Sequence, residues 1–108
     1  MDAYAEEILV KARERIDAPE KWCQGHFVDG ERRCAEGALH WVTSENYALS
    51  GRPYANAWRY LKLACGEGIV RYNDNHTHAE VMVAFDRAIE LARRGRAPES
   101  MIQEERNG

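Results

Sequence analysis

An amphipathic segment over residues 78–94 constrains the fold of this chain more than any other feature of the sequence. Its apolar side chains recur every three or four positions, a spacing that gathers them on one face of an α-helix. Thr77 and Glu80 have capping-box spacing, in which each side chain pairs with a backbone N–H at the start of the helix. Other elements must then cover the apolar face. Its members are Val81, Ala84, Phe85, Ala88, Ile89 and Ala92.

Three further segments have the same helical period, and we expect helices over residues 3–16, 33–42 and 53–65. Pro19 ends the first of them, because proline cannot continue the backbone hydrogen-bond ladder. Gly37 lies inside the second, where glycine costs about 1 kcal/mol relative to alanine in an exposed helix. We therefore expect another part of the chain to lie close to Gly37.

The helical period is interrupted over residues 25–33, where Asp29-Gly30 has the composition of a tight turn between two strands. This pattern predicts a short β-hairpin. Such a hairpin is marginally stable alone in water, so side chains must hold it against the helices. The apolar residues in position to do so are Trp22, Phe27 and Val28.

The remaining segments complete a single domain. Residues 69–72 are expected to form an extended link to a polar loop over residues 73–78, and residues 96–108 a mobile polar tail. A chain of 108 residues has room for one hydrophobic core. The predicted fold is mainly α, a compact bundle of about four helices with one short β-hairpin, over residues 1–95.

Charge and composition exclude several classes of protein. The 15 basic and 18 acidic residues are interspersed and leave a net charge of -3, so a broad basic surface for nucleic-acid phosphates is not expected. No apolar run approaches the roughly 20 residues of a membrane-spanning helix. Three cysteines are too few for a disulfide framework. We expect a cytoplasmic protein with reduced thiols that binds neither membrane nor nucleic acid.

Cysteine and histidine residues offer two weak chemical patterns. Zinc binds such residue types, and a possible ligand set is Cys23, His26 and Cys34, with His76 or His78 as the fourth ligand. This set lacks the two closely spaced ligand pairs of a strong zinc motif. A thiol at a helix start can have a lowered pKa, and a histidine beside Cys34 would then act as its base. Cysteines of this kind are more often small core side chains. We therefore expect no metal, no cofactor and no catalytic residue.

The polar residues before the last predicted helix have two interpretations. Asn73, Asp74 and Asn75, with His76 and His78, offer hydrogen-bond donors and acceptors on a loop, where binding residues often lie. The same residue types favour turns, because their side chains bond to nearby backbone. A role in the turn and the cap is the commoner outcome, and recognition by these side chains is the alternative.

Two aromatic residues lie off the apolar faces of their predicted helices. Trp41 and Tyr60 are therefore expected at the surface, where aromatic side chains form protein-binding or self-association contacts. They join the residues of the polar loop as predicted binding residues, and a homodimer is one expected outcome.

Several motifs give the chain a resemblance to a known family. They are Trp22-Cys23-Gln24-Gly25, Cys34-Ala35-Glu36-Gly37-Ala38-Leu39, Tyr72-Asn73-Asp74, Thr77-His78-Ala79-Glu80-Val81 and Phe85-Asp86-Arg87-Ala88-Ile89. Over about residues 5–92 the chain resembles a small domain family of unknown function from bacterial, chiefly actinobacterial, and bacteriophage genomes. The resemblance implies a fold, and it implies no activity, cofactor or catalytic residue. It also suggests, by analogy, a phage or mobile-element protein that binds larger proteins.

These observations favour a non-enzymatic interaction domain that presents the hairpin, Trp41 and the 73–78 loop to an unidentified protein. The alternative is a small-ligand-binding protein or a thiol-dependent hydrolase with a pocket between the hairpin and that loop. Its polar groups would be Cys34, Asp74, His76 and His78.

Overall fold

The computed structural model describes residues 1–95, and the tail predicted over residues 96–108 lies outside them. The described part is mainly helical with one antiparallel hairpin, which confirms the predicted fold class. No helix within it has the length and apolar character needed to cross a membrane. Its elements are α1 (Ala3–Arg15), η1 (Pro19–Lys21), β1 (Val28–Asp29), β2 (Arg32–Arg33), α2 (Ala35–Glu45), η2 (Tyr47–Leu49), α3 (Arg52–Cys65), α4 (Ile69–Asn75) and α5 (His78–Arg94).

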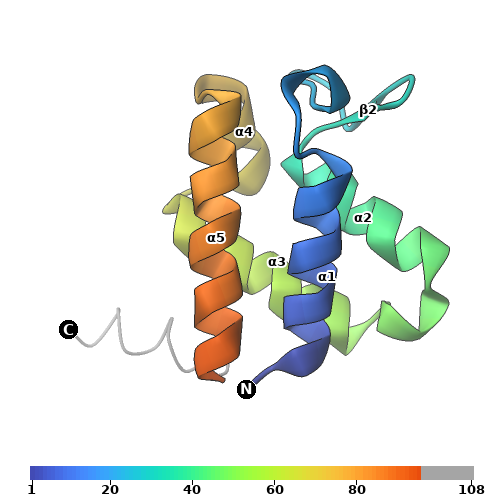
Figure 1. Cartoon of the computed structure of the whole chain (residues 1–108), viewed down its shortest axis with the longest axis vertical. Coiled ribbons are helices and arrows are strands. Elements are labelled where there is room, and N and C mark those ends of the chain that lie inside the picture. Colours follow the sequence, from blue (N-terminus) through green and yellow to red (C-terminus); the bar gives the residue numbers. More distant parts are fainter. Residues whose placement is uncertain (96–108) are drawn as a thin grey trace.

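Helices α1 and α5 lie side by side in opposite directions, α3 crosses behind them, and α2 packs on the other side of α1 (Figure 1). The apolar faces predicted from the helical period meet between these four helices. Their contact forms one hydrophobic core, as expected for a domain of this size. The largest apolar side chains with no more than 1% exposure include Ile8, Leu9, Leu39, Leu61 and Phe85.

Tyr60 on α3 belongs to this core and is 0% exposed, so the prediction that it lies at the surface is wrong. Helix α3 packs against both α1 and α5, and it therefore buries a wider sector than a single apolar stripe. The Tyr60 hydroxyl is hydrogen-bonded to the carboxylate of Asp2, which removes the cost of burying a polar group. Tyr60 is therefore no longer a candidate binding residue.

Helix α5 begins at the predicted position. Glu80 N donates to Thr77 Oγ1 at 3.1 Å, and Thr77 N donates to Glu80 Oε1 at 2.9 Å. These two bonds complete the capping box and satisfy backbone groups that the first helical turn leaves free. The start of α5 is thus determined by local sequence.

The hairpin forms in the predicted segment and is shorter than the predicted range. Val28 pairs with Arg33 around a turn that contains Gly30, whose φ of 63° is readily adopted by glycine. Of the three side chains expected to hold the hairpin, Trp22 packs against the core and Phe27 meets the His40 ring of α2 edge-on at 6.2 Å, although Phe27 and Val28 stay 50% and 53% exposed. A backbone hydrogen bond from Cys34 N to Phe27 O, at 3.2 Å, also connects this segment to the start of α2.

Residues 69–75 form helix α4, so the prediction of an extended link followed by a loop is wrong there. Ile69 and Asn73 lie four positions apart, and both are buried on the side of α4 that faces the bundle. Asparagine favours turns because its side chain competes for nearby backbone groups. In this helix the Asn73 side chain has tertiary partners, and that competition is removed.

Gly37 has the close neighbour that its position in a helix predicts. A Cβ atom at this position would overlap the backbone carbonyl of Phe27, which lies at the base of the hairpin. A backbone atom cannot rotate out of the way as a side chain can. The absence of a side chain at Gly37 therefore permits the hairpin to approach α2.

We predict that Gly37→Ala lowers the free energy of unfolding by about 1–3 kcal/mol, because overpacking outweighs the helix propensity of alanine. Urea denaturation followed by circular dichroism measures this change. Gly68→Ala is the matched control, since Gly68 has a φ of -55° and open space around its Cβ position. We expect the control to change stability by less than about 1 kcal/mol. A stabilised Gly37→Ala protein would contradict the close approach.

Candidate functional site

Asn73 is the buried polar residue around which the motif residues of the sequence assemble. Its side chain is 0% exposed, although a carboxamide carries two hydrogen-bond donors and an acceptor. Trp22 Nε1 and Ala35 N donate to Asn73 Oδ1 at 2.6 and 3.0 Å. Asn73 Nδ2 donates to Cys23 O at 3.0 Å. Both ends of the buried amide therefore have partners, as buried polar groups require.

The side-chain amide of Asn73 lies where the next hydrogen bond of a parallel β-ladder would form. Trp22 and Arg33 form an isolated parallel bridge, in which Cys23 N donates to Arg33 O at 3.1 Å. A continued parallel ladder would next join Ala35 N to Cys23 O. The Asn73 carboxamide lies between those two groups, because it accepts from Ala35 N and donates to Cys23 O. The Asn73 side chain of α4 thus takes the place of a direct backbone hydrogen bond between the two segments.

Gln24 extends the same junction over the C-terminal end of α4. Its Nε2 lies 3.0 Å from Asn73 O, 3.2 Å from Asp74 O and 3.0 Å from His76 O. These carbonyl groups belong to the helix end and its cap, where no intrahelical donor is available. Gly25 N donates in turn to Asp74 Oδ1 at 3.0 Å. Segment 22–25 is therefore bonded to the end of α4 through side chains from both.

The two histidines of the predicted loop are held by backbone carbonyl groups. His76 Nδ1 lies 2.8 Å from Tyr72 O, and its ring stacks on the Tyr72 ring at a centroid distance of 3.7 Å. His78 Nε2 lies 2.7 Å from Ile16 O, at the end of α1. Its ring also meets the Trp22 ring edge-on at 5.5 Å. A carbonyl oxygen only accepts, so each of these ring nitrogens is the donor.

The predicted binding residues over 73–78 therefore divide into two groups. The side chains of Asn73, Asp74 and His78 bond to distant segments of the fold, whereas those of Asn75 and His76 bond to backbone of α4. Asn75 Nδ2 donates to Arg71 O at 2.9 Å, within its own helix. The interpretation as local turn and cap contacts therefore describes Asn75 and His76, while Asn73, Asp74 and His78 form tertiary hydrogen bonds.

Cys34 caps the N-terminus of α2 through its sulfur. Gly37 N lies 3.3 Å from Cys34 Sγ, and the Cys34 side chain is buried. Burial raises the pKa of the Cys34 thiol, and the backbone hydrogen bonds lower it by a smaller amount. The preferred interpretation of Cys34 as a small buried side chain is therefore confirmed, and the alternative of a lowered pKa is not supported, because loss of water outweighs the helix N-terminus.

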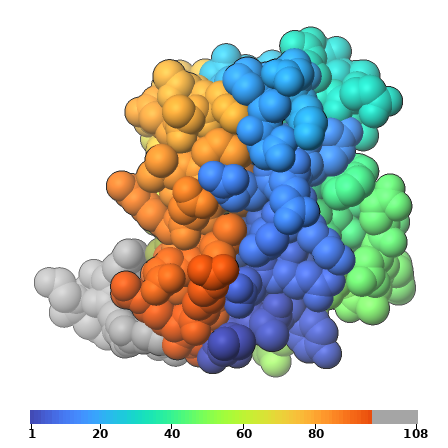
Figure 2. Space-filling model, viewed as in Figure 1, coloured from blue at the N-terminus to red at the C-terminus, as the bar shows by residue number. Residues whose placement is uncertain are grey.

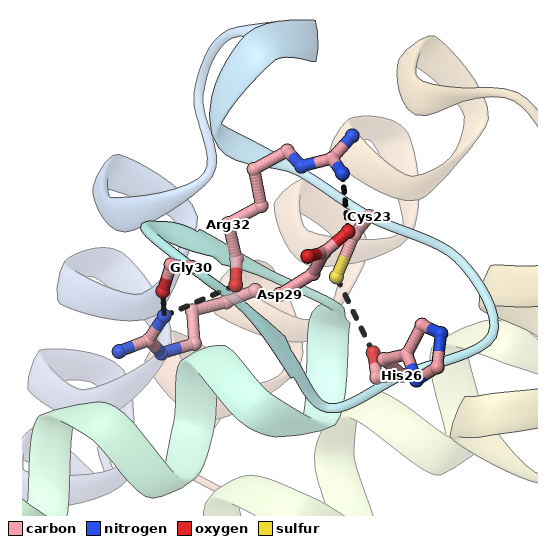
Figure 3. A network of polar contacts seen from close by, with 6 residues as sticks. Cys23, His26, Asp29, Gly30 and Arg32 are labelled. Carbon is pink, nitrogen blue, oxygen red and sulfur yellow. Dashed lines mark hydrogen bonds and ion pairs between the residues drawn. The ribbon is translucent and has the colours of Figure 1, made fainter.

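The Cys23 thiol contacts the backbone of His26 and not its imidazole ring. Cys23 Sγ donates to His26 O at 3.3 Å, and Figure 3 shows the sulfur directed at that oxygen while the imidazole ring extends away. Beside them, Arg32 pairs with Asp29 across the hairpin turn. Burial raises the pKa of the Cys23 thiol as well. Within residues 1–95, no three His, Cys, Asp or Glu side chains are placed to hold a metal ion.

A surface groove of about 910 Å³ lies among α1, η1, the hairpin turn and the C-terminal half of α2. Trp41 and Val42 supply its apolar part, and Trp41 is half-buried. The guanidinium carbon of Arg15 lies 5.3 Å from the centroid of the Trp41 ring, a cation–π arrangement. Figure 2 shows the hairpin (cyan), α1 (blue) and α2 (green) along one side of the molecule. We call this feature the Trp41 groove.

A second hollow of about 460 Å³ adjoins Trp41 from the side of the hairpin. Phe27, Val28 and His40 line it, and the first two are about half exposed. The Trp41 side chain lines both hollows, which agrees with its predicted surface position. Exposed apolar side chains next to a half-buried tryptophan are typical of surfaces that bind other molecules.

Sequence reasoning missed two sets of residues. The sequence includes Gln24 in a motif but does not predict that it bonds to the end of α4. The one indication of such a role is its place between Trp22 and Gly25 in that motif. The charged residues of the Trp41 groove come from α1, η1 and α2, and nothing in their spacing along the chain indicates that they share a surface.

The structure defines a small helical domain whose motif residues mainly join parts of its own fold. The chain belongs to a family of unknown function, DUF6197, whose family model matches residues 2–91. Comparisons with curated proteins and with solved structures give no match.

We predict that Asn73→Ala lowers the free energy of unfolding by about 3 kcal/mol or more, because Trp22 Nε1, Ala35 N and Cys23 O lose their buried partner. Chemical denaturation measures the change. Asn75→Ala is the control: it removes an exposed amide from the same helix and should cost less than about 1 kcal/mol. Equal losses in the two variants would show that the Asn73 amide does not hold the junction.

We also predict that stability declines at alkaline pH. Burial raises the pKa of Cys65 from 9.0 to about 12 and that of Tyr60 from 10.0 to about 12. Above about pH 9 the unfolded chain therefore loses protons that the folded chain retains, and the free energy of unfolding falls until the folded groups ionise near pH 12. Urea midpoints from pH 7 to 11 measure this, and Cys65→Ala should make the decline shallower, with the remainder due to Cys23, Cys34 and Tyr60, whose pKa values burial also raises.

Proposed function

We propose that this chain is a non-enzymatic interaction domain that binds a protein partner through the Trp41 groove and the adjoining hairpin surface. The single observation that supports this best is the position of Trp41 between two hollows, with exposed Phe27 and Val28 beside it. Aromatic residues in such settings contribute a large share of binding energy at protein interfaces.

The polar groups of the alternative function are used in the fold. Cys34 Sγ accepts from Gly37 N, while His76 and His78 each bond to a backbone carbonyl. A thiol hydrolase needs a thiolate with a base within hydrogen-bond reach, and burial favours the neutral thiol of Cys34. The observations therefore favour binding over thiol chemistry.

The proposed partner is a larger protein whose activity this small domain modulates, in keeping with the analogy to phage and mobile-element domains. A second copy of the chain is the other occupant that the surface admits, and it would produce a homodimer. The proposed setting is the cytoplasm, where the three thiols stay reduced.

Site-specific photo-crosslinking tests this proposal in the native cell. A benzophenone amino acid at Ser44, on α2 beside the second hollow, should form one discrete adduct. The same amino acid at Val83, which is 47% exposed on α5, should form none. Mass spectrometry of the adduct distinguishes a larger partner from a second copy of the chain.

Trp41→Ala, introduced with the crosslinker at Ser44, should abolish the adduct, and Trp41→Phe should retain part of it because the aromatic contact survives. Circular dichroism verifies that both variants fold. Absence of a Ser44 adduct, or an adduct that persists in Trp41→Ala, would reject the proposed surface.

A further inference from the structure

The basic and acidic residues around the Trp41 groove differ in whether they form ion pairs. Its three basic residues each have an acidic partner: Lys11 Nζ lies 2.9 Å from Glu7 Oε2, and Lys21 Nζ lies 2.9 Å from Asp17 Oδ1. Arg15 donates to the backbone oxygen of Glu31 at 2.6 Å, and its guanidinium lies 3.9 Å from the Glu31 carboxylate. These basic side chains are therefore already neutralised within the domain.

Three carboxylates that line the same groove have no such partner. Glu14 on α1, Glu20 on η1 and Glu45 at the end of α2 are exposed, and none of them forms an ion pair with another residue of the 1–95 segment. Their charges are therefore free to act on an incoming molecule.

The C-terminal end of α2 adds to this negative potential. Unpaired carbonyl groups give a helix C-terminus a partial negative charge, which basic residues in the last turn usually offset. Helix α2 has no basic residue in its last turn and ends at Glu45. Glu45 and Asn46 line the groove, so the negative helix end and the carboxylate face the same space.

The apolar part of the groove also suits a cationic segment. The Arg15 guanidinium lies over the Trp41 ring, so this ring makes a cation–π contact within the domain. Lysine and arginine side chains have long methylene stems that pack on apolar surface while their charged ends reach carboxylates. Trp41 supplies most of that apolar surface, because Val42 is only 2% exposed, and the rim carries the unpaired carboxylates beside the paired basic residues.

We infer that the groove binds a lysine- or arginine-rich segment of the partner protein. This inference rests on the proposed function and adds the chemistry of the partner to it. Nucleic acids and anionic membranes are repelled by the unpaired carboxylates. A free polyamine would meet the same charges, but it would leave the Trp41 and Val42 surface without an apolar counterpart.

The test uses a short amphipathic peptide of leucine and lysine, its leucine and glutamate counterpart, and spermine. We expect the lysine peptide alone to bind, and salt to weaken it. In ¹H–¹⁵N spectra the Trp41 indole signal should shift. The indole signals of Trp22 and Trp58 serve as internal references, because their N–H groups are bonded to Asn73 and Glu36.

The triple variant Glu14→Gln, Glu20→Gln and Glu45→Gln should weaken binding of the lysine peptide by about tenfold at low salt. A control triple variant, Glu67→Gln, Asp86→Asn and Glu90→Gln, changes the net charge equally away from the groove and should leave binding unchanged. Equal binding of the two peptides, spermine binding as tight as that of the lysine peptide, or an unaffected groove variant would overturn the inference.

The crosslinking experiment distinguishes an error in the inferred cationic segment from an error in the proposed protein-binding function. A Ser44 adduct that persists in the groove triple variant would reject the cationic segment while leaving a protein-binding surface at Trp41. Absence of any Ser44 adduct would reject the proposed function itself, whatever the peptides do.

Discussion

The fold depends on one buried carboxamide. Asn73 joins segments that lie 38 to 51 positions away in the chain, because its side chain donates to Cys23 O and accepts from Trp22 Nε1 and Ala35 N. A buried polar group is costly unless all of its partners are present, so the partners must approach together. The amide therefore specifies how the segment before α2 lies against α4, and the hairpin follows from that placement.

This junction determines which surface remains for function. The residues from which the family resemblance was drawn, such as Gln24 and Gly37, are occupied by contacts inside the domain. Their position also brings the hairpin close to α2, so that Phe27 and Val28 stand beside Trp41. The motif residues thus act on the proposed binding surface indirectly, by shaping its walls.

Sequence reasoning succeeded where the physical cause is local. The capping box at Thr77 and Glu80, the turn at Gly30 and the close neighbour of Gly37 each follow from residues within one or two turns of chain, or from a missing side chain. It failed for the segment 69–75 and for the surface position of Tyr60. In both cases tertiary contacts reversed a local preference.

The amino-acid sequence alone determined the helical periods, the main helix-start and turn signals and the mainly α class. It also contains no strong catalytic motif. Each of these features depends on neighbours along the chain. The tertiary structure alone decided that Asn73 is a buried connector and that Trp41 lies in a groove with three unpaired carboxylates. Hydrogen-bond partners and groove walls come from distant segments. Their meeting is a property of packing in three dimensions that local patterns do not encode.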